Sequence, residues 1–410
     1  MNLKNIDRRQ MTILLIVFVN IVGASMILPI LPLYAQRHFH MNPRVITLLN
    51  TSFFGAQFIA GPYLGRWSDR SGRMPVLIIS QIGTVVSFIM LALAQSVDVL
   101  FLARILDGIT GGNIIVAQAY ITDVTPPQKR TQALGYIFGA FGLGFVIGPA
   151  VGGILSAMFG ERIPFLIAAV AAAATVLLTW YTLDESLSPE QRAHNRSFKK
   201  STLKPKEVLS NSLLMLILII AFGGQFGLGL LQSTFALYGQ AVLFDGFNEQ
   251  TTNLGIGLLL AMIGLGQFFT QIYLLKRVLP RFGEAKLAVG GSFIRAASLF
   301  LLAVLTAPWL GPIAAAGFAI GTGLMMPPLQ SLATQTVADE LRGGVLGVYQ
   351  SSVSFSTIIA SAISGTLFDI RPSLPYWVGG ALFIMIGIQA LRLLKWSMPL
   401  IEKTAPSAAD

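Results

Sequence analysis

Long apolar runs alternate with short polar segments along most of the chain. Each run is about 20 residues or longer, the length that a helix needs to cross roughly 30 Å of hydrocarbon. Twelve helical spans are predicted, over residues 11–36, 45–65, 75–96, 98–121, 131–158, 163–183, 211–240, 252–275, 286–306, 309–334, 343–368 and 374–396. The roughly ten-residue segments of alternating polarity that are typical of membrane β-barrels are absent. The pattern therefore predicts an all-α membrane protein with twelve transmembrane helices.

The composition agrees with this class and excludes others. Of the 410 residues, 54% are hydrophobic and 11% are charged, whereas a soluble globular chain has about 25% charged residues. A net charge of +10 is also typical of nucleic-acid binding. Here the basic residues lie in short loops between apolar runs, so no nucleic-acid partner is expected. The chain has no cysteine, which excludes disulfides and thiolate metal sites.

The basic residues are distributed unequally between the two ends of the predicted helices. Of the 28 Lys and Arg residues, 22 lie in the two tails, the central linker and the loops on the same side, and four lie in the opposite loops. Loops rich in Lys and Arg remain in the cytoplasm. We therefore expect both termini and the linker to be cytoplasmic, in a multi-pass protein of the cell (inner) membrane.

An internal repeat divides the chain into two halves. The loop "LGRWSDRSGR" (64–73) aligns with "LKRVLPRFGE" (275–284) at an offset of about 211, which pairs Gly72 with Gly283. Paired six-helix halves pack around a central site and rock against each other in many transporters. The predicted organisation is an N-terminal six-helix bundle (1–183), a cytoplasmic linker (184–210), a C-terminal six-helix bundle (211–396) and a cytoplasmic tail (397–410).

Two charges stand inside the fourth predicted span. Arg104 and Asp107 lie three residues apart in "ARILDGITGGN" (103–113), and this spacing places them on one helix face. A charge at mid-membrane costs roughly 2.5–3.5 kcal/mol on insertion scales, so such residues pair or line a cavity. Either the pair only neutralises itself, or it faces a central cavity where Asp107 carries a proton beside Arg104. Asp107 is the only carboxylate well inside any predicted span.

Several motifs resemble those of a known family. The loop "GPYLGRWSDRSGRMPVL" (61–77) resembles the G-x-L-x-D-R-x-G-R signature of the major facilitator superfamily, and "LFLARILDGITGGN" (100–113) resembles the arginine motif of its fourth helix. The segment "GLGFVIGPAVGGIL" (142–155) resembles the fifth-helix motif of its drug:proton antiporters. "YITDVTPPQKR" (120–130) is similar to the tetracycline- and quinolone-exporter branch. The resemblance implies the major facilitator fold, with two pseudo-symmetric six-helix bundles.

The resemblance also implies two groups of gating residues. In the family, the loop aspartate that Asp69 matches latches one state through contacts between the halves, while the second-half equivalent is Pro280. The implied gating and latch residues are Gly65, Asp69, Arg70, Gly72, Arg73, Asp123 and Arg130. The implied helix-five motif is Gly144, Gly148, Pro149, Gly152 and Gly153. Small residues let helices approach closely in lipid, so ordinary helix packing remains an alternative for this motif.

Polar residues inside the spans are candidates for a substrate cavity, because amides in hydrocarbon need partners and point inward. The polar cavity candidates are Asn20, Gln57, Asn113, Gln118, Gln232 and Arg295, and Phe235 is a candidate for an aromatic wall of the cavity. Asn20 stands where tetracycline exporters have a first-helix aspartate, and Gln232 where the quinolone-exporter branch has an acid. Arg295 falls near a ninth-helix aspartate of tetracycline exporters. These departures favour neutral or anionic substrates.

These features predict a secondary transporter that works by alternating access. The first hypothesis is proton-coupled efflux of small amphipathic compounds or drugs, and the alternative is a facilitator or symporter for a metabolite such as a sugar or an organic anion. No constellation of catalytic residues indicates an enzyme. His38 and His40 in the first outer loop are a weak metal signal without a nearby carboxylate, so no metal and no cofactor are expected. The expected partners are a small-molecule substrate, protons and the lipid bilayer, and we expect a monomer.

Overall fold

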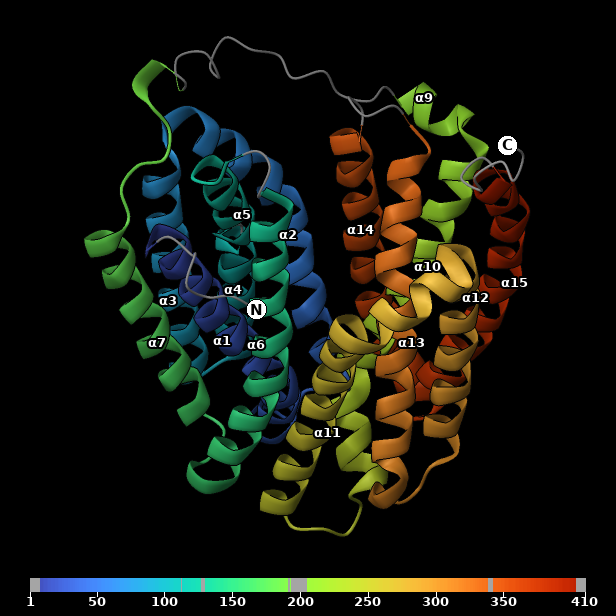
Figure 1. The fold of residues 1–410 in the computed structure, drawn as a ribbon. Coiled ribbons are helices and arrows are strands. Elements are labelled where there is room, and N and C mark those ends of the chain that lie inside the picture. Colours follow the sequence, from blue (N-terminus) through green and yellow to red (C-terminus); the bar gives the residue numbers. More distant parts are fainter. Residues whose placement is uncertain are drawn as a thin grey trace, which may run out of the picture.

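The computed structural model describes residues 8–111, 113–126, 130–190, 192, 205–337 and 342–402. All regular secondary structure within these ranges is helical (Figure 1). A helix satisfies its own backbone hydrogen bonds, as a chain in hydrocarbon requires. The apolar runs of the sequence therefore become helices along their whole length.

Two groups of helices are separated by the linker region. The first group contains α1 (Arg8–Phe39), α2 (Pro43–Ser71), α3 (Arg73–Leu93), α4 (Val97–Thr110), α5 (Asn113–Asp123), α6 (Arg130–Phe159) and α7 (Ile163–Thr182). The short α9 (Pro205–Ser210) follows. The second group contains α10 (Ser212–Tyr238), η3 (Gly239–Leu243), α11 (Glu249–Phe269), η4 (Thr270–Leu274), α12 (Leu275–Val304), η5 (Pro308–Leu310), α13 (Gly311–Gln335), α14 (Arg342–Ile370) and α15 (Leu374–Glu402).

The predicted spans correspond closely to these helices. Within the described ranges, ten helical stretches are long and apolar enough to cross a membrane. One of them, Glu249–Val304, contains both α11 and α12, and α2 lies outside the ten because polar and charged residues interrupt it. Separating α11 from α12 and adding α2 gives the twelve predicted spans. One detail was not predicted: the fourth span divides into α4 and α5 beside Gly111.

The two groups lie side by side and meet along several pairs of helices. In Figure 1 the blue-to-green group stands beside the yellow-to-red group, and α6 contacts α11, α2 contacts α14 and α1 contacts α10. We call the end of the molecule at α9 the linker end and the opposite end the far end. The domain boundaries at residues 183 and 211 stay a prediction.

Asparagine side chains fix where three helices begin. Asn42 Oδ1 accepts a hydrogen bond from the Val45 amide at 2.9 Å, and Asn248 Oδ1 accepts one from the Thr251 amide at 2.8 Å. Both caps lie at the far end, where α2 and α11 start. Asn211 caps α10 in the same way. A side-chain cap satisfies an amide that a helix start leaves unpaired, so α2 and α11 begin at defined positions beside the interface.

The internal repeat has a counterpart in the backbone. Gly72, between α2 and α3, has φ of 111°, and Gly283, inside α12, has φ of 72°. These are the two glycines that the sequence repeat pairs. Positive φ is readily reached by glycine alone. The same unusual backbone at two aligned positions supports a common origin for these two turns.

Candidate functional site

Arg104 and Asp107 form an ion pair inside the first group of helices. Arg104 Nη1 donates to Asp107 Oδ2 at 3.0 Å, and each residue is 5% exposed. The guanidinium lies over the Phe53 ring of α2, 4.1 Å from its centroid. Arg104 Nε is buried without a hydrogen-bond partner in the described structure. A buried cation on an aromatic face is stabilised by the ring quadrupole, which offsets part of its desolvation.

Close helix packing encloses this pair. A Cβ atom on Gly108 would collide with the Phe53 carbonyl oxygen, so glycine lets α2 lie directly on α4. Phe53 consequently covers Arg104. In this conformation the pair is packed between α4 and α2, and its predicted contact with a water-filled cavity would need α2 to move. The proton-coupling role of Arg104 and Asp107 stays a prediction.

The polar cavity candidates of the first group have partners nearby. Asn20 Nδ2 donates to the Ile16 carbonyl at 2.9 Å within α1 and is buried. Gln57 Nε2 donates to the Gly111 carbonyl at 3.3 Å, where α4 ends. Gln118 is half-buried on α5. The Asn113 side chain lies outside the described part of the structure.

The candidates of the second group differ in their surroundings. Gln232 is half-buried and Phe235 is buried on α10. Arg295 is 0% exposed, and its Nη2 donates to the Gly224 carbonyl at 2.8 Å. Its guanidinium lies 4.0 Å from the centroid of the Phe383 ring. Arg295 therefore lies inside the second group in this structure, and its place in a substrate cavity stays a prediction.

The predicted latch residues form a network within the first group. Arg73 Nη1 lies 2.6 Å from Asp69 Oδ1, and Arg73 Nε donates to Asp123 Oδ2 at 2.9 Å. Arg73 Nη1 also donates to Ser68 Oγ at 2.7 Å. Arg73 thus ties the end of α2 to the end of α5. These contacts hold the loop in place, and a contact from Asp69 to the second group stays a prediction.

The remaining latch candidates lie around this network. Gly65 lies on α2, where a Cβ atom would come 4.0 Å from Ile115 of α5, which is ordinary contact. Arg70 is exposed at the end of α2. The Arg130 side chain lies outside the described part of the structure. Gly65 thus does not need to be glycine for close packing in this conformation.

An acidic residue of the predicted linker, Glu185, binds the turn between α2 and α3. Glu185 Oε1 accepts from the Arg73 amide at 2.9 Å, and Oε2 accepts from the Met74 amide at 3.2 Å. Both amides belong to the first turn of α3, where a carboxylate is favoured by the helix dipole. A Cβ atom on Gly72 would collide with Glu185 Oε2. Gly72 therefore combines a positive φ with the space into which the Glu185 carboxylate fits.

Gly72→Ala is expected to lower the melting temperature more than Gly283→Ala. Both positions have positive φ, which costs a non-glycine residue about 1–3 kcal/mol. Only Gly72 also faces Glu185, whereas nothing lies within 4 Å of a Cβ on Gly283. The measurement is thermal unfolding of both purified variants in the same detergent. Equal shifts would contradict a separate contribution from the Glu185 contact.

The helix-five motif packs α6 against α1. A Cβ atom on Gly148 would collide with Ser25 Oγ, and one on Gly144 would come 2.5 Å from Ile21 Cγ2. Ser25 Oγ donates to the Gly144 carbonyl at 3.0 Å. On Gly152, a Cβ would come 3.2 Å from the Met26 carbonyl oxygen. These glycines let the two backbones approach, which is how small residues promote association in lipid.

Gly153 and Pro149 face the other group of helices instead. A Cβ atom on Gly153 would lie 2.9 Å from the Asn253 carbonyl oxygen and 3.1 Å from Gly257 Cα, both on α11. In return, a Cβ on Gly257 would lie 2.5 Å from the Pro149 carbonyl oxygen. Backbone therefore meets backbone where α6 crosses α11. The motif has two contact faces, one within the first group and one between the groups.

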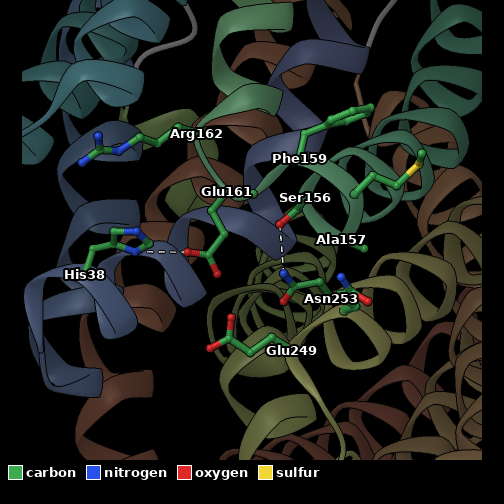
Figure 2. A pocket seen from close by; sticks show the side chains of 11 residues that line it. His38, Ser156, Ala157, Phe159, Glu161, Arg162, Glu249 and Asn253 are labelled. Atoms are coloured by element: carbon green, nitrogen blue, oxygen red, sulfur yellow. Dashed lines mark hydrogen bonds and ion pairs between the residues drawn. The ribbon is translucent and has the colours of Figure 1, made fainter.

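Charged residues gather beside this crossing at the far end. Arg37 Nη1 donates to Glu161 Oε1 at 2.6 Å and to Asn253 Oδ1 at 3.1 Å, and lies 3.8 Å from Glu249 Oε2. Asn253 Nδ2 donates to Ser156 Oγ at 3.0 Å (Figure 2). Arg37 and Glu161 belong to the first group, and Asn253 and Glu249 to α11. We call Arg37, His38, Glu161, Glu249 and Asn253 the far-end ion cluster.

A second set of contacts joins α2 to α14 at the same end. The hydroxyls of Thr51 and Ser361 are 2.9 Å apart, and Arg44 Nε lies 2.9 Å from Asp369 Oδ2. A Cβ atom on Gly365 would come 2.6 Å from Arg44 Cα. The α6–α11 and α2–α14 crossings are therefore both closely packed at the far end. The structure represents a conformation in which this end is closed.

Aromatic side chains also meet across the interface. The ring centroids of Phe58 on α2 and Phe355 on α14 are 6.4 Å apart, and Phe222 on α10 is 6.3 Å from Phe355. Phe58 and Phe355 are both exposed. Exposed aromatic side chains of both groups therefore meet at this part of the interface.

A comparison with protein families decides what this architecture is. The family model described as Major Facilitator Superfamily matches residues 13–248 and 246–409, which is nearly the whole chain. The chain belongs to the Major Facilitator Superfamily. Its fold is the superfamily's fold, and the resemblance seen in the sequence motifs is confirmed. Members of this superfamily are transporters that bind small-molecule substrates.

Relatives within the superfamily match along almost their full length. The chain is 30% identical over 397 residues to the tetracycline resistance protein, class E, of Escherichia coli, which covers 95% of this chain and 94% of the relative. It is 27% identical over 391 residues to multidrug resistance protein 2 of Bacillus subtilis (strain 168), covering 94% and 95% respectively. This member of the superfamily is thus similar to proteins named for tetracycline resistance and for multidrug resistance.

Solved structures share the fold at low identity. The human organic anion transporter MFSD10 (TETRAN) superposes with a TM-score of 0.69 at 19% identity, covering 93% of this chain and 99% of that one. The nucleoside transporter NupG gives a TM-score of 0.73 at 13% identity, covering 96% and 100%. At these low identities, the structural similarity supports the superfamily fold and does not indicate which substrate the protein transports.

Sequence reasoning missed two residues that this superfamily member uses in its contacts. Glu185 was assigned to the linker, although an acidic pair directly after the sixth span, in a basic linker, was a usable signal. The prediction also placed no carboxylate near His38, which is wrong: Glu161 Oε2 lies 3.2 Å from His38 Nδ1. His38 and Glu161 are far apart in the sequence, and only the fold brings α1 to the loop between α6 and α7.

Proposed function

We propose that this transporter exports small amphipathic compounds across the cell membrane in exchange for protons, by alternating access. Relatives named for tetracycline and multidrug resistance match along nearly the whole chain and support the export of drug-like compounds. The observation that carries the proton coupling is the buried Arg104–Asp107 pair, with a nitrogen–oxygen distance of 3.0 Å. Buried ionisable pairs in membrane helices are typical of ion pathways.

The mechanism follows from what each side chain does to the other. With Asp107 ionised, Arg104 is neutralised and Phe53 covers the pair, which favours the packing of α2 on α4 seen here. A proton on Asp107 removes one charge and leaves Arg104 without its partner. An unpaired buried cation is unfavourable, so α2 and α4 rearrange and admit water or substrate to Arg104. Proton binding and the conformation of the first group are thereby linked.

A second candidate function has a specific observation in its favour. Asn20 and Gln232 are amides at positions where the exporter branches have acids, and a lipophilic cation is best recognised by an acid. Transport of a neutral or anionic metabolite therefore remains the alternative. The solved structures of a nucleoside transporter and an organic anion transporter share the fold and do not decide between the two.

Reconstitution of the purified protein into proteoliposomes tests both. The panel contains tetracycline, a fluorescent lipophilic cation, an organic anion and a nucleoside, each measured with and without an imposed pH gradient. The proposal expects the first or second compound to accumulate against its gradient and to stop when the pH gradient is collapsed with an ionophore. Equilibration of only the anion or nucleoside, independent of pH gradient, would instead establish the alternative.

A further inference from the structure

The far-end ion cluster contains a buried acid at the boundary between the two groups of helices. Glu161 is 7% exposed, although it lies in the loop between α6 and α7. Its Oε1 pairs with Arg37 at 2.6 Å, while its Oε2 is buried without a hydrogen bond in the described structure and lies 3.2 Å from His38 Nδ1. One carboxylate oxygen is therefore positioned to hold a proton.

Charged and titratable groups from two helices face Glu161. Arg37 and His38 come from α1, and Glu249 comes from α11. Arg162 follows Glu161 in its own loop, and its Nε donates to the Tyr34 hydroxyl at 3.2 Å. Burial raises the pKa of Glu161 above its ordinary value, and nearby Glu249 adds to this, while Arg37 and His38 lower it without cancelling the rise.

A pocket gives solvent a route to this acid. It has a volume of about 400 Å³, and its lining includes Glu161, His38, Gln250 and Asn253 (Figure 2). The Glu249 side chain, which also lines it, is 78% exposed. The pocket spans the boundary between the loop of the first group and the start of α11. A proton from solution on this side can reach Glu161 without crossing the protein.

We propose that Glu161 is a proton-binding site of the far-end gate, and that a proton taken up from the far side stabilises the closed gate. The charge bias of the loops predicts that this side is external. The proton binds and leaves on one side and is not transported. The proposal therefore goes beyond proton-coupled export and holds even if Asp107 carries no proton.

The direction of the effect follows from linkage. Opening the far end separates α11 from α1 and hydrates Glu161, so its pKa returns toward the ordinary value. The closed gate binds the proton more tightly, and acidification favours closure; this stabilisation is lost as pH rises through the raised pKa. Protonated Glu161 no longer holds Arg37, which keeps its contacts with Asn253 and Glu249 of α11.

The absence of cysteine in the chain permits clean spin labelling of the gate. Gln95, between α3 and α4, and Thr306, between α12 and η5, are exposed at the far end of the two groups. A Gln95→Cys/Thr306→Cys protein in nanodiscs, without substrate or pH gradient, reports the distance between the groups by double electron–electron resonance. Between pH 8 and pH 5, the ratio of short to long distances should rise, because the closed gate binds the proton more tightly than the open one.

Three variants decide whether Glu161 is the site. Glu161→Gln in this background should remove the pH response, whereas Asp245→Asn, at an exposed carboxylate of the same end, should keep it. Arg37→Gln removes a charge that lowers the pKa of Glu161. The midpoint of the pH response in this variant should therefore move to higher pH. A pH-independent parent protein, or a full pH response in Glu161→Gln, would overturn the proposal, and loss of the response in His38→Gln would then identify His38 as the site. If Glu161→Gln does not fold, an unmoved midpoint in Arg37→Gln overturns it.

Discussion

Asp107→Asn is expected to abolish uphill transport while leaving substrate exchange across the membrane intact. Asparagine cannot take up a proton in the physiological range, so the link between the proton and the conformation of α2 and α4 is lost. Accumulation should therefore fall to the level of equilibration, because the imposed pH gradient no longer drives the substrate. The measurement is gradient-driven uptake and counterflow in the same proteoliposomes, with the best substrate of the panel.

Two controls separate proton coupling from loss of a structural ion pair. Asp98→Asn changes an exposed acid in the first turn of the same helix and should leave transport unchanged. The second control is Arg104→Gln/Asp107→Asn. Breaking a buried pair by removing one partner costs about 3–5 kcal/mol because a lone charge stays buried, and the double variant removes that charge.

The double variant distinguishes the two interpretations of the pair. If the pair is only structural, neutralising both residues should restore thermal stability and uphill transport together. If Asp107 carries the proton, stability should recover while uphill transport stays lost. Full uphill transport by the stable double variant would rule out the proton role of Asp107 and leave the fold unaffected.

Gly153→Ala is expected to prevent closure of the far end. The added Cβ would lie 2.9 Å from the Asn253 carbonyl oxygen and 3.1 Å from Gly257 Cα, and neither backbone atom can move aside as a flexible side chain would. Overpacking costs typically 1–3 kcal/mol, which lowers the closed population by roughly 5- to 150-fold. Transport should fall in proportion, because alternating access needs this closure in every cycle. The spin-label distance across the far end should lengthen at the same time.

Gly139→Ala supplies the matched control for this prediction. Gly139 lies on the same helix, and nothing lies within 4 Å of a Cβ there. Alanine is a better helix former than glycine, so both variants gain the same intrinsic helix propensity. Normal transport and short distances in Gly153→Ala would show that the contact between α6 and α11 does not control closure.

The features that depend on the local pattern of apolar residues and glycines could be predicted from the sequence. Apolar runs located all twelve spans, and the aligned glycines Gly72 and Gly283 share positive φ. Side-chain partners from distant helices were not predictable in this way. Arg295 is enclosed by aromatic rings of α13 and α15, and Phe53 covers Arg104 from α2, because packing angles between helices decide which face meets which.

The backbone contact between Gly153 and Gly257 has a consequence for how the gate works. Ordering a long side chain costs up to about 2 kcal/mol of conformational entropy, and ordering glycine costs no side-chain entropy. Each closure of the seam between α6 and α11 therefore freezes no rotamers at its centre. At this contact the seam therefore opens and closes with almost no change in side-chain entropy.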